Sequence, residues 1–424
     1  MATKLIINAD LVFPDKVEAG WLFIDGSTIG AIGTEADAHP EADEIIDAEG
    51  AYLFPGLIDT HVHFREPGMT HKGNIASESL AARAGGVTTV MDMPNTKPLT
   101  STAALLREKL ELGRNTSAVD YHAYIAATPG IVKELRENPD LDIHAVKLFL
   151  GATTGSSGMP EPEELEELFK LCAERRLPIV VHAEDNDIIA RNTEAAIARY
   201  GYREAVPVGM HPAIRSREAC YNASREIVDY ARKYGTRLHL AHLTTADEIA
   251  LLENGPLEEK LITSETSPLY LTTAEFYGVR DLNRIKVNPA VKGDDDALAL
   301  RHALREGLID TVATDHAPHT LEEKSGSALT AASGAPHIQF ALPVLLNLLE
   351  PQEIARVMAK NPALLFNFPD RGELAPGKRA DLVLVKKVAP YFITDADVIS
   401  PCGWTPYCGH TASHRVLRTF LAGE

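Results

Sequence analysis

The stretch GLIDTHVHFREPG, residues 56–68, contains the two features that decide the fold class. Its first part, 56–64, is a short apolar run of the kind that forms a buried parallel strand. His61 and His63 stand near its end, two positions apart. Side chains two apart on an extended chain point to the same face, so both imidazoles can reach one divalent metal. The stretch therefore predicts a strand whose C-terminal end faces a metal site.

Seven further apolar runs follow, and amphipathic helical patterns separate most of them. The runs lie at 87–93, 119–127, 144–150, 177–184, 236–242, 260–267 and 309–319. The helical patterns include 75–85, 162–176 and 216–235. Eight strands with helices between them predict an α/β fold of the (β/α)8 TIM-barrel type, whose active site lies at the C-terminal ends of the strands. The acidic run Asp294–Asp296 is expected to be a solvated turn.

The two ends of the chain have a different pattern, with short strands joined by turns. Such runs lie at 4–13, 19–33 and 42–54, and again at 377–387 and 414–424. Asp25-Gly26 is a hairpin-type dipeptide between two of them. We expect the ends to combine into a small β-sandwich domain, with domain segments 1–54 and 369–424 flanking a barrel over 55–368.

Composition and charge exclude several classes of protein. The chain has 424 residues with 60 acidic and 41 basic side chains, a formal net charge of −19, which argues against a nucleic-acid-binding surface. No stretch of about eighteen apolar residues predicts a membrane span, and the N-terminal apolar run is too short for a secretory signal. The four cysteines are scattered, and the spacing of Cys402, Cys408 and His410 does not match a structural zinc motif. We expect a cytoplasmic protein with no nucleic-acid or membrane partner.

Metal-competent side chains recur at the ends of the later predicted strands. In chain order these are Lys147, His182, His242 and Asp315. Any one of these histidines, taken alone, could be an ordinary buried histidine, but together they would meet at one mouth of the barrel. His61, His63 and Asp315 can then hold one metal ion, and His182 and His242 a second.

Lys147 has two interpretations. On its position alone, the ordinary expectation is an ion pair with a nearby carboxylate. Beside two metal ions, however, an ammonium would be strongly repelled. Reaction with carbon dioxide would convert the amine to a carbamate, which is negative and offers two oxygen donors. The surrounding candidate ligands favour the carbamate.

Six segments resemble the landmarks of dihydroorotases, a group within the amidohydrolase superfamily, in both order and spacing. They are DTHVHFREPG (59–68), DMPNTKP (92–98), KLFLGATTGSSG (147–158), VVHAED (180–185), AHLTT (241–245) and ATDHAPHTLEEK (313–324). The flanking segments 49–59 and 372–384 are typical of amidohydrolases. The resemblance covers nearly the whole chain, and the combination of motifs is highly specific.

The resemblance implies a reaction and a set of site residues. The reaction is reversible hydrolysis of (S)-dihydroorotate to N-carbamoyl-L-aspartate in pyrimidine biosynthesis, catalysed by a homodimer. The implied cofactors are two Zn²⁺ ions bridged by N6-carboxylated Lys147 and a hydroxide, with Asp315 as the catalytic acid–base group. The implied metal ligands are His61, His63, Lys147, His182, His242 and Asp315. The implied ligands of the substrate carboxylate are Arg65, Asn95 and His319, and the planar donor fork of Arg65 suits that role.

Other functions stay open. A hydantoinase, dihydropyrimidinase or allantoinase would use the same metals on a different ring, and an inactive relative could scaffold a neighbouring enzyme. Dihydropyrimidines and simple hydantoins lack the carboxylate that Arg65 would bind. The retained ligand set argues against an inactive scaffold.

Two departures from the family pattern bear on the site. One dihydroorotase subgroup bridges its metals with an aspartate before a Gly-x-Pro turn, but here Ser157 precedes Gly158-Met159-Pro160, which favours the carbamate. Relatives also carry a His-His pair where Leu269 and Tyr270 stand, so the substrate wall near 264–271 is less certain. The run at 153–158 is a candidate lid loop.

Overall fold

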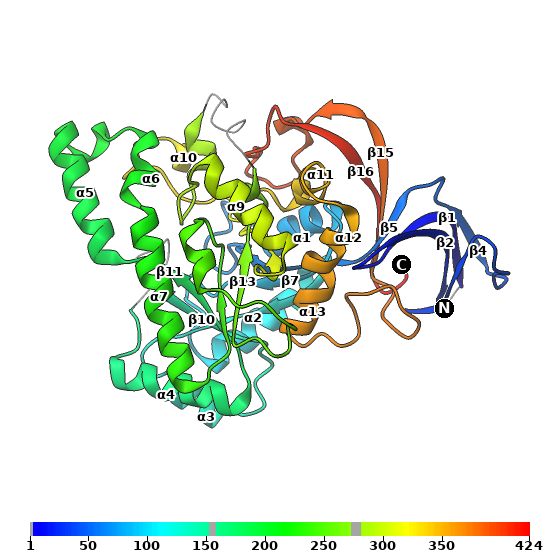
Figure 1. Cartoon of the computed structure of the whole chain (residues 1–424), viewed down its shortest axis with the longest axis horizontal. Helices are drawn as coiled ribbons and strands as arrows, with labels where there is room; N and C mark the ends of the chain where they lie inside the picture. The colour runs from blue at the N-terminus through cyan, green and yellow to red at the C-terminus, as the bar shows by residue number, and fades with distance from the viewer. Residues whose placement is uncertain (1–2, 152–157, 273–280) are drawn as a thin grey trace.

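The computed structural model describes residues 3–151, 158–272 and 281–424. Its centre is a barrel of parallel strands (Figure 1). The strands are β6 (Leu57–Val62), β7 (Val87–Asp92), β8 (Asp120–Ala123), β9 (Ile125–Ala126), β10 (Val146–Leu150), β11 (Ile179–Ala183), β12 (Leu238–Leu240), β13 (Ile262–Thr266) and β14 (Thr311–Val312). The predicted TIM-barrel fold is confirmed, with β8 and β9 together forming the expected strand at 119–127.

The barrel closes between its first and last strands. Val62 forms a parallel bridge with His316, and the His63 N–H donates to the His316 carbonyl at 2.8 Å. Its interior is filled by apolar side chains rather than open, as in other barrels of this type. Ile58, Met91 and Val180 pack there against Phe366 and other residues of the segment after the last barrel helix. Apolar side chains therefore fill the barrel interior, which leaves the mouth at the strands' C-terminal ends as the expected place for an active site.

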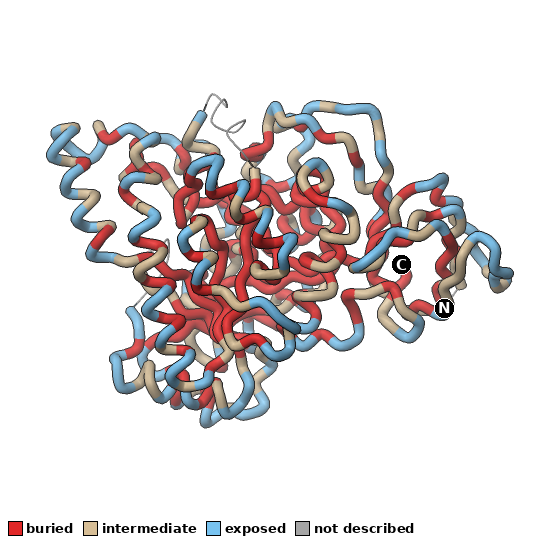
Figure 2. Tube along the Cα trace, viewed as in Figure 1, coloured by how far each residue is buried: buried red, intermediate tan, exposed pale blue. Residues whose placement is uncertain are grey.

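Helices surround the barrel, and three of them lie where the sequence predicts helices, at 75–85, 162–176 and 216–235. They include α1 (Ile75–Ala84), α2 (Ala103–Thr116), α4 (Pro162–Arg175), α5 (Asn186–Tyr200), α7 (Arg217–Tyr234) and α9 (Asp294–Arg305). Local capping explains several boundaries: Ser216 accepts a hydrogen bond from the Ala219 N–H at the start of α7. Buried residues concentrate between these helices and the barrel (Figure 2).

One predicted turn is wrong. Asp294–Asp296 begins α9, and Asp296 is buried. Its carboxylate accepts from the Gly293 and Ala246 N–H groups and pairs with Arg217. Acidic residues are favourable in the first turn of a helix, which explains why an acidic run here forms a helix start rather than a solvated turn.

The two ends of the chain form a small all-β unit beside the barrel (Figure 1). Its seven strands are β1 (Lys4–Val12), β2 (Val17–Asp25), β3 (Thr28–Thr34), β4 (Glu44–Asp47), β5 (Tyr52–Pro55), β15 (Leu382–Phe392) and β16 (Thr411–Phe420). The order is β16-β15-β5-β1-β2-β3, with β4 also paired to β1. A separate core joins side chains from both ends, among them Ile6, Leu22, Leu53, Leu382 and Phe420. The predicted small β domain, built from both termini, is confirmed.

Among the helices of the described residues, none is both long enough and apolar enough to cross a lipid bilayer.

Candidate active site

Eight of the nine predicted site residues line one narrow cavity at the barrel mouth. They are His61, His63, Arg65, Asn95, Lys147, His182, His242 and Asp315. They come from β6, β10 and β11, and from the turns that follow β6, β7, β12 and β14. Except for Lys147, the second residue of β10, these positions lie at or just after the C-terminal ends of parallel strands, where the barrel topology brings distant segments together.

His61, His63 and Asp315 form a group whose potential ligand atoms all lie within 4.8 Å of one another. Asp315 Oδ1 lies 2.9 Å from His63 Nε2 and 3.6 Å from His61 Nε2. Each imidazole is held through its other nitrogen: His63 Nδ1 donates to Asn95 Oδ1 at 2.7 Å, and His61 Nδ1 contacts the Glu265 carboxylate. This arrangement fixes the ring orientation and turns both Nε2 atoms towards Asp315, as in metal-binding histidines. The three side chains could hold a metal ion.

His182 and His242 form the second predicted pair. His182 Nδ1 and His242 Nε2 lie 2.9 Å apart, and the rings of His61 and His242 have centroids 5.2 Å apart. His61 therefore connects the two histidine groups. The other nitrogen of His182, Nε2, lies 2.9 Å from Glu184 Oε2, and Glu184 also contacts Arg215. His182 and His242 thus lie next to the group of His61, His63 and Asp315, and the Glu184 carboxylate holds His182 on the side away from that group.

Lys147 is fully buried between these groups. Among the described residues its Nζ has no hydrogen-bond partner and forms no ion pair, so the expected alternative of a lysine paired with a carboxylate is not what the structure contains. Burial lowers the pKa of Lys147 to about 8, against the opposing charges of Glu265 and Asp315. The amine of Lys147 is thus surrounded by histidines and a carboxylate but has no hydrogen-bond partner among the described residues. Such an environment fits a lysine that takes part in a metal centre.

The three residues predicted to bind the substrate's carboxylate, Arg65, Asn95 and His319, are placed differently in the structure. Arg65 is buried and lines the cavity with Asn95, and burial lowers its pKa only to about 10, so it stays charged at neutral pH. Arg65 Nε donates to the Pro318 carbonyl at 3.0 Å. His319 is not among the described lining residues; its Nε2 lies 3.1 Å from Arg65 Nη2. The structure places His319 against Arg65, and its contact with substrate stays a prediction.

Three of the site residues have an unusual backbone conformation. Arg65, His242 and Asp315 have φ angles of 69°, 40° and 55°. Positive φ is uncommon for residues other than glycine and carries a conformational cost, so such residues cluster where function requires a particular side-chain direction. All three lie two or three residues after the end of a barrel strand, which indicates that the turns are shaped to aim these side chains into the mouth.

Glu265 is a site residue that the sequence reasoning missed. It lies within β13, is buried, and contacts His61 Nδ1; Thr60 Oγ1 donates to it at 3.4 Å. His239 Nε2 lies 3.5 Å from the same carboxylate. One feature of the sequence could have pointed to Glu265. It is the only acidic residue in SETS (264–267), on a predicted strand of the barrel. Such a group needs a buried partner.

Of the two departures from the family pattern, the one at Leu269 and Tyr270 falls on described residues, and neither lines this cavity. Leu269 and Tyr270 belong to a short helix, α8 (Pro268–Leu271); both are buried, and neither is among the described lining residues. Tyr270 OH donates to the Pro289 carbonyl at 2.8 Å. The candidate lid at 153–158 falls, except for Gly158, outside the described residues, as does Ser157. Described residues that complete the wall are Phe149, Asn288, Ala317, Ser333 and Gly334.

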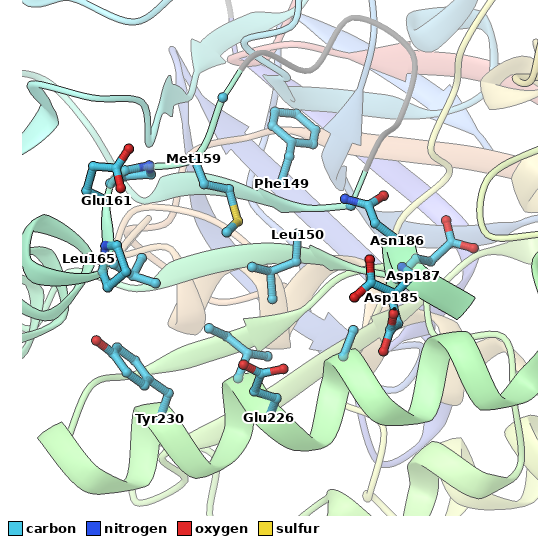
Figure 3. Close-up of a pocket in the computed structure, with 17 residues that line it drawn as sticks. Phe149, Leu150, Met159, Glu161, Leu165, Asp185, Asn186, Asp187, Glu226 and Tyr230 are labelled. Atoms are coloured by element: carbon cyan, nitrogen blue, oxygen red, sulfur yellow. Dashed lines mark hydrogen bonds between the residues drawn. The ribbon is translucent and has the colours of Figure 1, made fainter. Parts of the chain in front are cut away.

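A larger cavity, of about 860 Å³, adjoins the site but differs from it in chemistry. Leu150, Met159, Leu165 and Tyr230 point into it between β10, α4 and α7 (Figure 3). Phe149 lines both cavities. None of the predicted ligands lines the larger one, so the convergence of nitrogen and oxygen ligands, rather than size, identifies the smaller cavity as the candidate active site.

Comparisons with known proteins identify the family. Residues 52–423 match the model of the amidohydrolase family. The chain is 35% identical to a dihydroorotase of Halobacterium salinarum, over 91% of this chain and 88% of that protein. It is 32% identical to a dihydroorotase of Mycobacterium tuberculosis, over 95% and 94% of the two chains.

Solved structures show the same fold. An L-hydantoinase (dihydropyrimidinase) from Arthrobacter aurescens superposes with a TM-score of 0.92 at 26% identity, covering 100% of this chain and 96% of that one. A dihydropyrimidinase from Brevibacillus agri gives a TM-score of 0.86 at 23% identity, over 99% and 94%. The chain therefore belongs to the amidohydrolase family, as a cyclic amide hydrolase whose relatives include dihydroorotases.

Proposed function

We propose that this chain is a dihydroorotase that interconverts (S)-dihydroorotate and N-carbamoyl-L-aspartate in pyrimidine synthesis. The observation that carries the proposal is the presence, in one cavity, of metal-competent side chains and a buried, charged Arg65. The dihydroorotase relatives support the same reading. By similarity to related enzymes, the proposal includes a cytoplasmic homodimer.

The proposed centre would hold two zinc ions. His61, His63 and Asp315 would bind one, His182 and His242 the other, and Lys147 as its carbamate would bridge them. The buried amine of Lys147 has no hydrogen-bond partner among the described residues, and this supports the bridge because a buried polar group without such a partner is unfavourable. Divalent ions bound at this place would lower the pKa of water and polarise the amide carbonyl.

The chain's own residues supply proton transfer and orientation. Asp315 would accept the proton of the attacking water on its carboxylate and return it to the ring nitrogen as the C–N bond breaks. A carbon–oxygen bond to the water oxygen forms as the C–N bond breaks, and the nitrogen gains one of the two water protons. The second proton passes to solvent when the new carboxyl group ionises to a carboxylate. His61 and His63 are held by Glu265 and Asn95, so neither ring needs to reorient during the reaction.

Arg65 would bind the carboxylate that the substrate carries on its ring. Its guanidinium reaches the cavity while its Nε is fixed on the Pro318 carbonyl, so the remaining N–H groups keep one direction. Holding the ring in one orientation lowers the entropic part of the barrier. Neutral rings would gain nothing from this contact.

A hydantoinase is the second candidate, favoured by the likeness to the hydantoinase of Arthrobacter aurescens. A substrate panel decides between them: dihydroorotate, dihydrouracil, a 5-substituted hydantoin and allantoin, assayed with purified enzyme and with Arg65→Met. We expect dihydroorotate to be preferred, and Arg65→Met to raise KM for dihydroorotate while its metal content stays that of the wild type. Turnover of the neutral rings with dihydroorotate inert would reject the proposal.

A further inference from the structure

Lys324 is a buried lysine that no step of the proposed reaction uses. Its side chain is 2% exposed, and its Nζ donates to the carbonyl oxygens of Lys286 at 2.8 Å, Ala332 at 3.0 Å and Gly334 at 2.8 Å. Three acceptors match the three N–H groups of an ammonium. Within the described ranges Lys324 forms no ion pair, so its hydrogen bonds to the backbone define its role.

The three carbonyls belong to two segments that form one wall of the site. Asn288, two residues after Lys286, lines the cavity, and so do Ser333 and Gly334. The Gly334 N–H also donates to the Lys286 carbonyl, at 3.0 Å. Lys324 and this backbone hydrogen bond thus join the segments 286–288 and 332–334 directly behind the surface that faces the ligands.

The same wall backs the predicted carboxylate site. A Cβ added to Gly334 would lie 2.8 Å from the Ala317 carbonyl oxygen and 2.9 Å from His319 Cδ2, so the backbone approaches this turn as closely as it can. His319 Nε2 lies 3.2 Å from the Ser333 carbonyl and 3.1 Å from Arg65 Nη2. A shift of 332–334 would therefore change the surroundings of Arg65.

The far side of Lys324 is closed by Trp404, from the segment between β15 and β16. Lys324 Nζ lies 5.6 Å from the Trp404 ring, whose Nε1 donates to the His319 carbonyl at 2.7 Å. Trp404 is fully buried. The lysine is therefore packed between the indole and the wall, with its ammonium directed to the wall.

We propose that Lys324 is a positioning residue for substrate binding, whose ammonium holds 286–288 and 332–334 at the spacing that the bound ring requires. The inference rests on the proposed function only for the identity of the substrate. It predicts that loss of the ammonium weakens substrate binding far more than it slows the bound substrate's reaction, because the metal-competent side chains are attached to other strands.

The test compares Lys324→Met, which keeps the side-chain length, with Lys260→Met as a matched control. Lys260 is also buried and donates to the Gly307 carbonyl and Asp310, each at 2.6 Å, but it stands before β13, at the opposite end of the barrel. For Lys324→Met we expect KM for dihydroorotate to rise about tenfold or more with kcat within about threefold. Bound metal should equal that of the wild type. Lys260→Met should lower the melting temperature and leave KM unchanged.

A second variant, Lys324→Gln, retains two N–H donors and should give a smaller rise in KM. An unchanged KM in either folded Lys324 variant, with any loss confined to kcat or to melting temperature, overturns the inference. Failure of both variants to fold while Lys260→Met folds also overturns it, because the lysine's role would then be folding. If the wild type does not turn over dihydroorotate, the proposed function fails instead, and the same comparison is made on the panel substrate that it does use.

Discussion

Lys147 is the residue on which the proposed chemistry depends most. Burying an amine without a partner is unfavourable in either protonation state, since an ammonium lacks a counter-ion and a neutral amine lacks an acceptor. Its neighbours are two histidine pairs and Asp315 rather than a single carboxylate. Conversion to a carbamate that binds two metals would satisfy the side chain and complete the ligand set.

The first prediction concerns Lys147→Ala. We expect loss of at least one metal ion per chain and a fall in activity of about a hundredfold or more, because the bridging ligand is removed. Short carboxylic acids such as acetate or propionate should restore part of the activity by occupying the vacated space. Metal content by elemental analysis, with activity measured with and without the acids, checks both statements. A variant with two metals and normal turnover would show that Lys147 is not the bridge.

The second prediction concerns Glu265→Gln. The amide keeps the shape but not the charge of the group against His61 Nδ1, so His61 becomes a weaker ligand. Metal affinity should fall by about 10-fold to 100-fold, as for other outer-shell partners of metal-bound histidines. Competition with a chelator measures the affinity. Glu248→Gln is the control, since Glu248 is also buried but contacts Ser224 and Thr245 instead; retention of wild-type affinity in Glu265→Gln would contradict the prediction.

The contrast between Lys147 and Glu265 shows what a sequence reveals of a site. Lys147, His182 and His242 lie in predicted barrel strands and inside recognisable motifs, so their meeting follows once the barrel is predicted. Glu265 stands mid-strand, and its partner His61 is 204 positions away. No local pattern pairs two such residues, because the contact arises from closure of the barrel.

Among the elements, α9 differs most from its expected form. The run Asp294–Asp296 looks like a solvated turn because three adjacent carboxylates repel one another and favour water. In the structure two of them are exposed, whereas Asp296 turns inward to the Gly293 and Ala246 N–H groups. The sequence alone does not show that the Ala246 N–H, from another part of the chain, donates to the Asp296 carboxylate. Without this contact, neither the helix start nor the burial of Asp296 can be predicted.

The third prediction tests this helix start. Asp296→Ala should lower the free energy of unfolding by about 1–3 kcal/mol, because two N–H groups and Arg217 lose their acceptor. Asp295→Ala, one residue earlier and exposed, should change it by less than about 0.5 kcal/mol. Denaturant titrations of the two variants give both values, and equal effects would contradict the assignment.

At the scale of the whole molecule, Arg371 joins parts of the chain that are far apart. Its Nη1 donates to Thr89 Oγ1 on β7 at 2.8 Å and contacts Asp120 at the start of β8. Arg379, just before β15, lies 3.0 Å from the same carboxylate. Burial raises the pKa of Asp120, but contacts with His122 and Arg371 outweigh it and bring the pKa below its ordinary value. The link between barrel and β unit is therefore ionic as well as apolar.

The fourth prediction follows from that pKa. Arg371→Met should lower the free energy of unfolding at pH 7 by about 2 kcal/mol or more, since a largely buried carboxylate loses its main cation. A lowered carboxyl pKa contributes stability above the unfolded value of about 3.9, and this contribution is lost as the pH falls further. The difference between wild type and variant should thus be constant from pH 7 to 5 and shrink below about pH 4. Urea titrations across this range measure it.

The control for this experiment is Arg114→Met, which breaks an exposed ion pair with Asp142. It should cost less than about 0.5 kcal/mol at any of these pH values. A difference for Arg371→Met that grows on acidification would contradict the assigned sign.

The overall architecture could be read from the sequence, because strand and helix periodicities alternate through the barrel and stop at both ends. The pairing order of the terminal strands could not, since the pattern of 4–13 or 377–387 does not specify a partner. In the structure β5 lies between β1 and β15. The boundaries at 54/55 and 368/369 stay predictions.

The interleaved order of the small sheet has a consequence for biosynthesis. β5 leaves the ribosome early, but the strand that covers its second edge, β15, is translated only after every barrel strand. Throughout that interval the edge of β5 presents unpaired N–H and C=O groups, which is the feature that leads strands to associate with other chains. The nascent chain thus carries an open strand edge for as long as the barrel is being translated, and the small sheet can be completed only when β15 has been made.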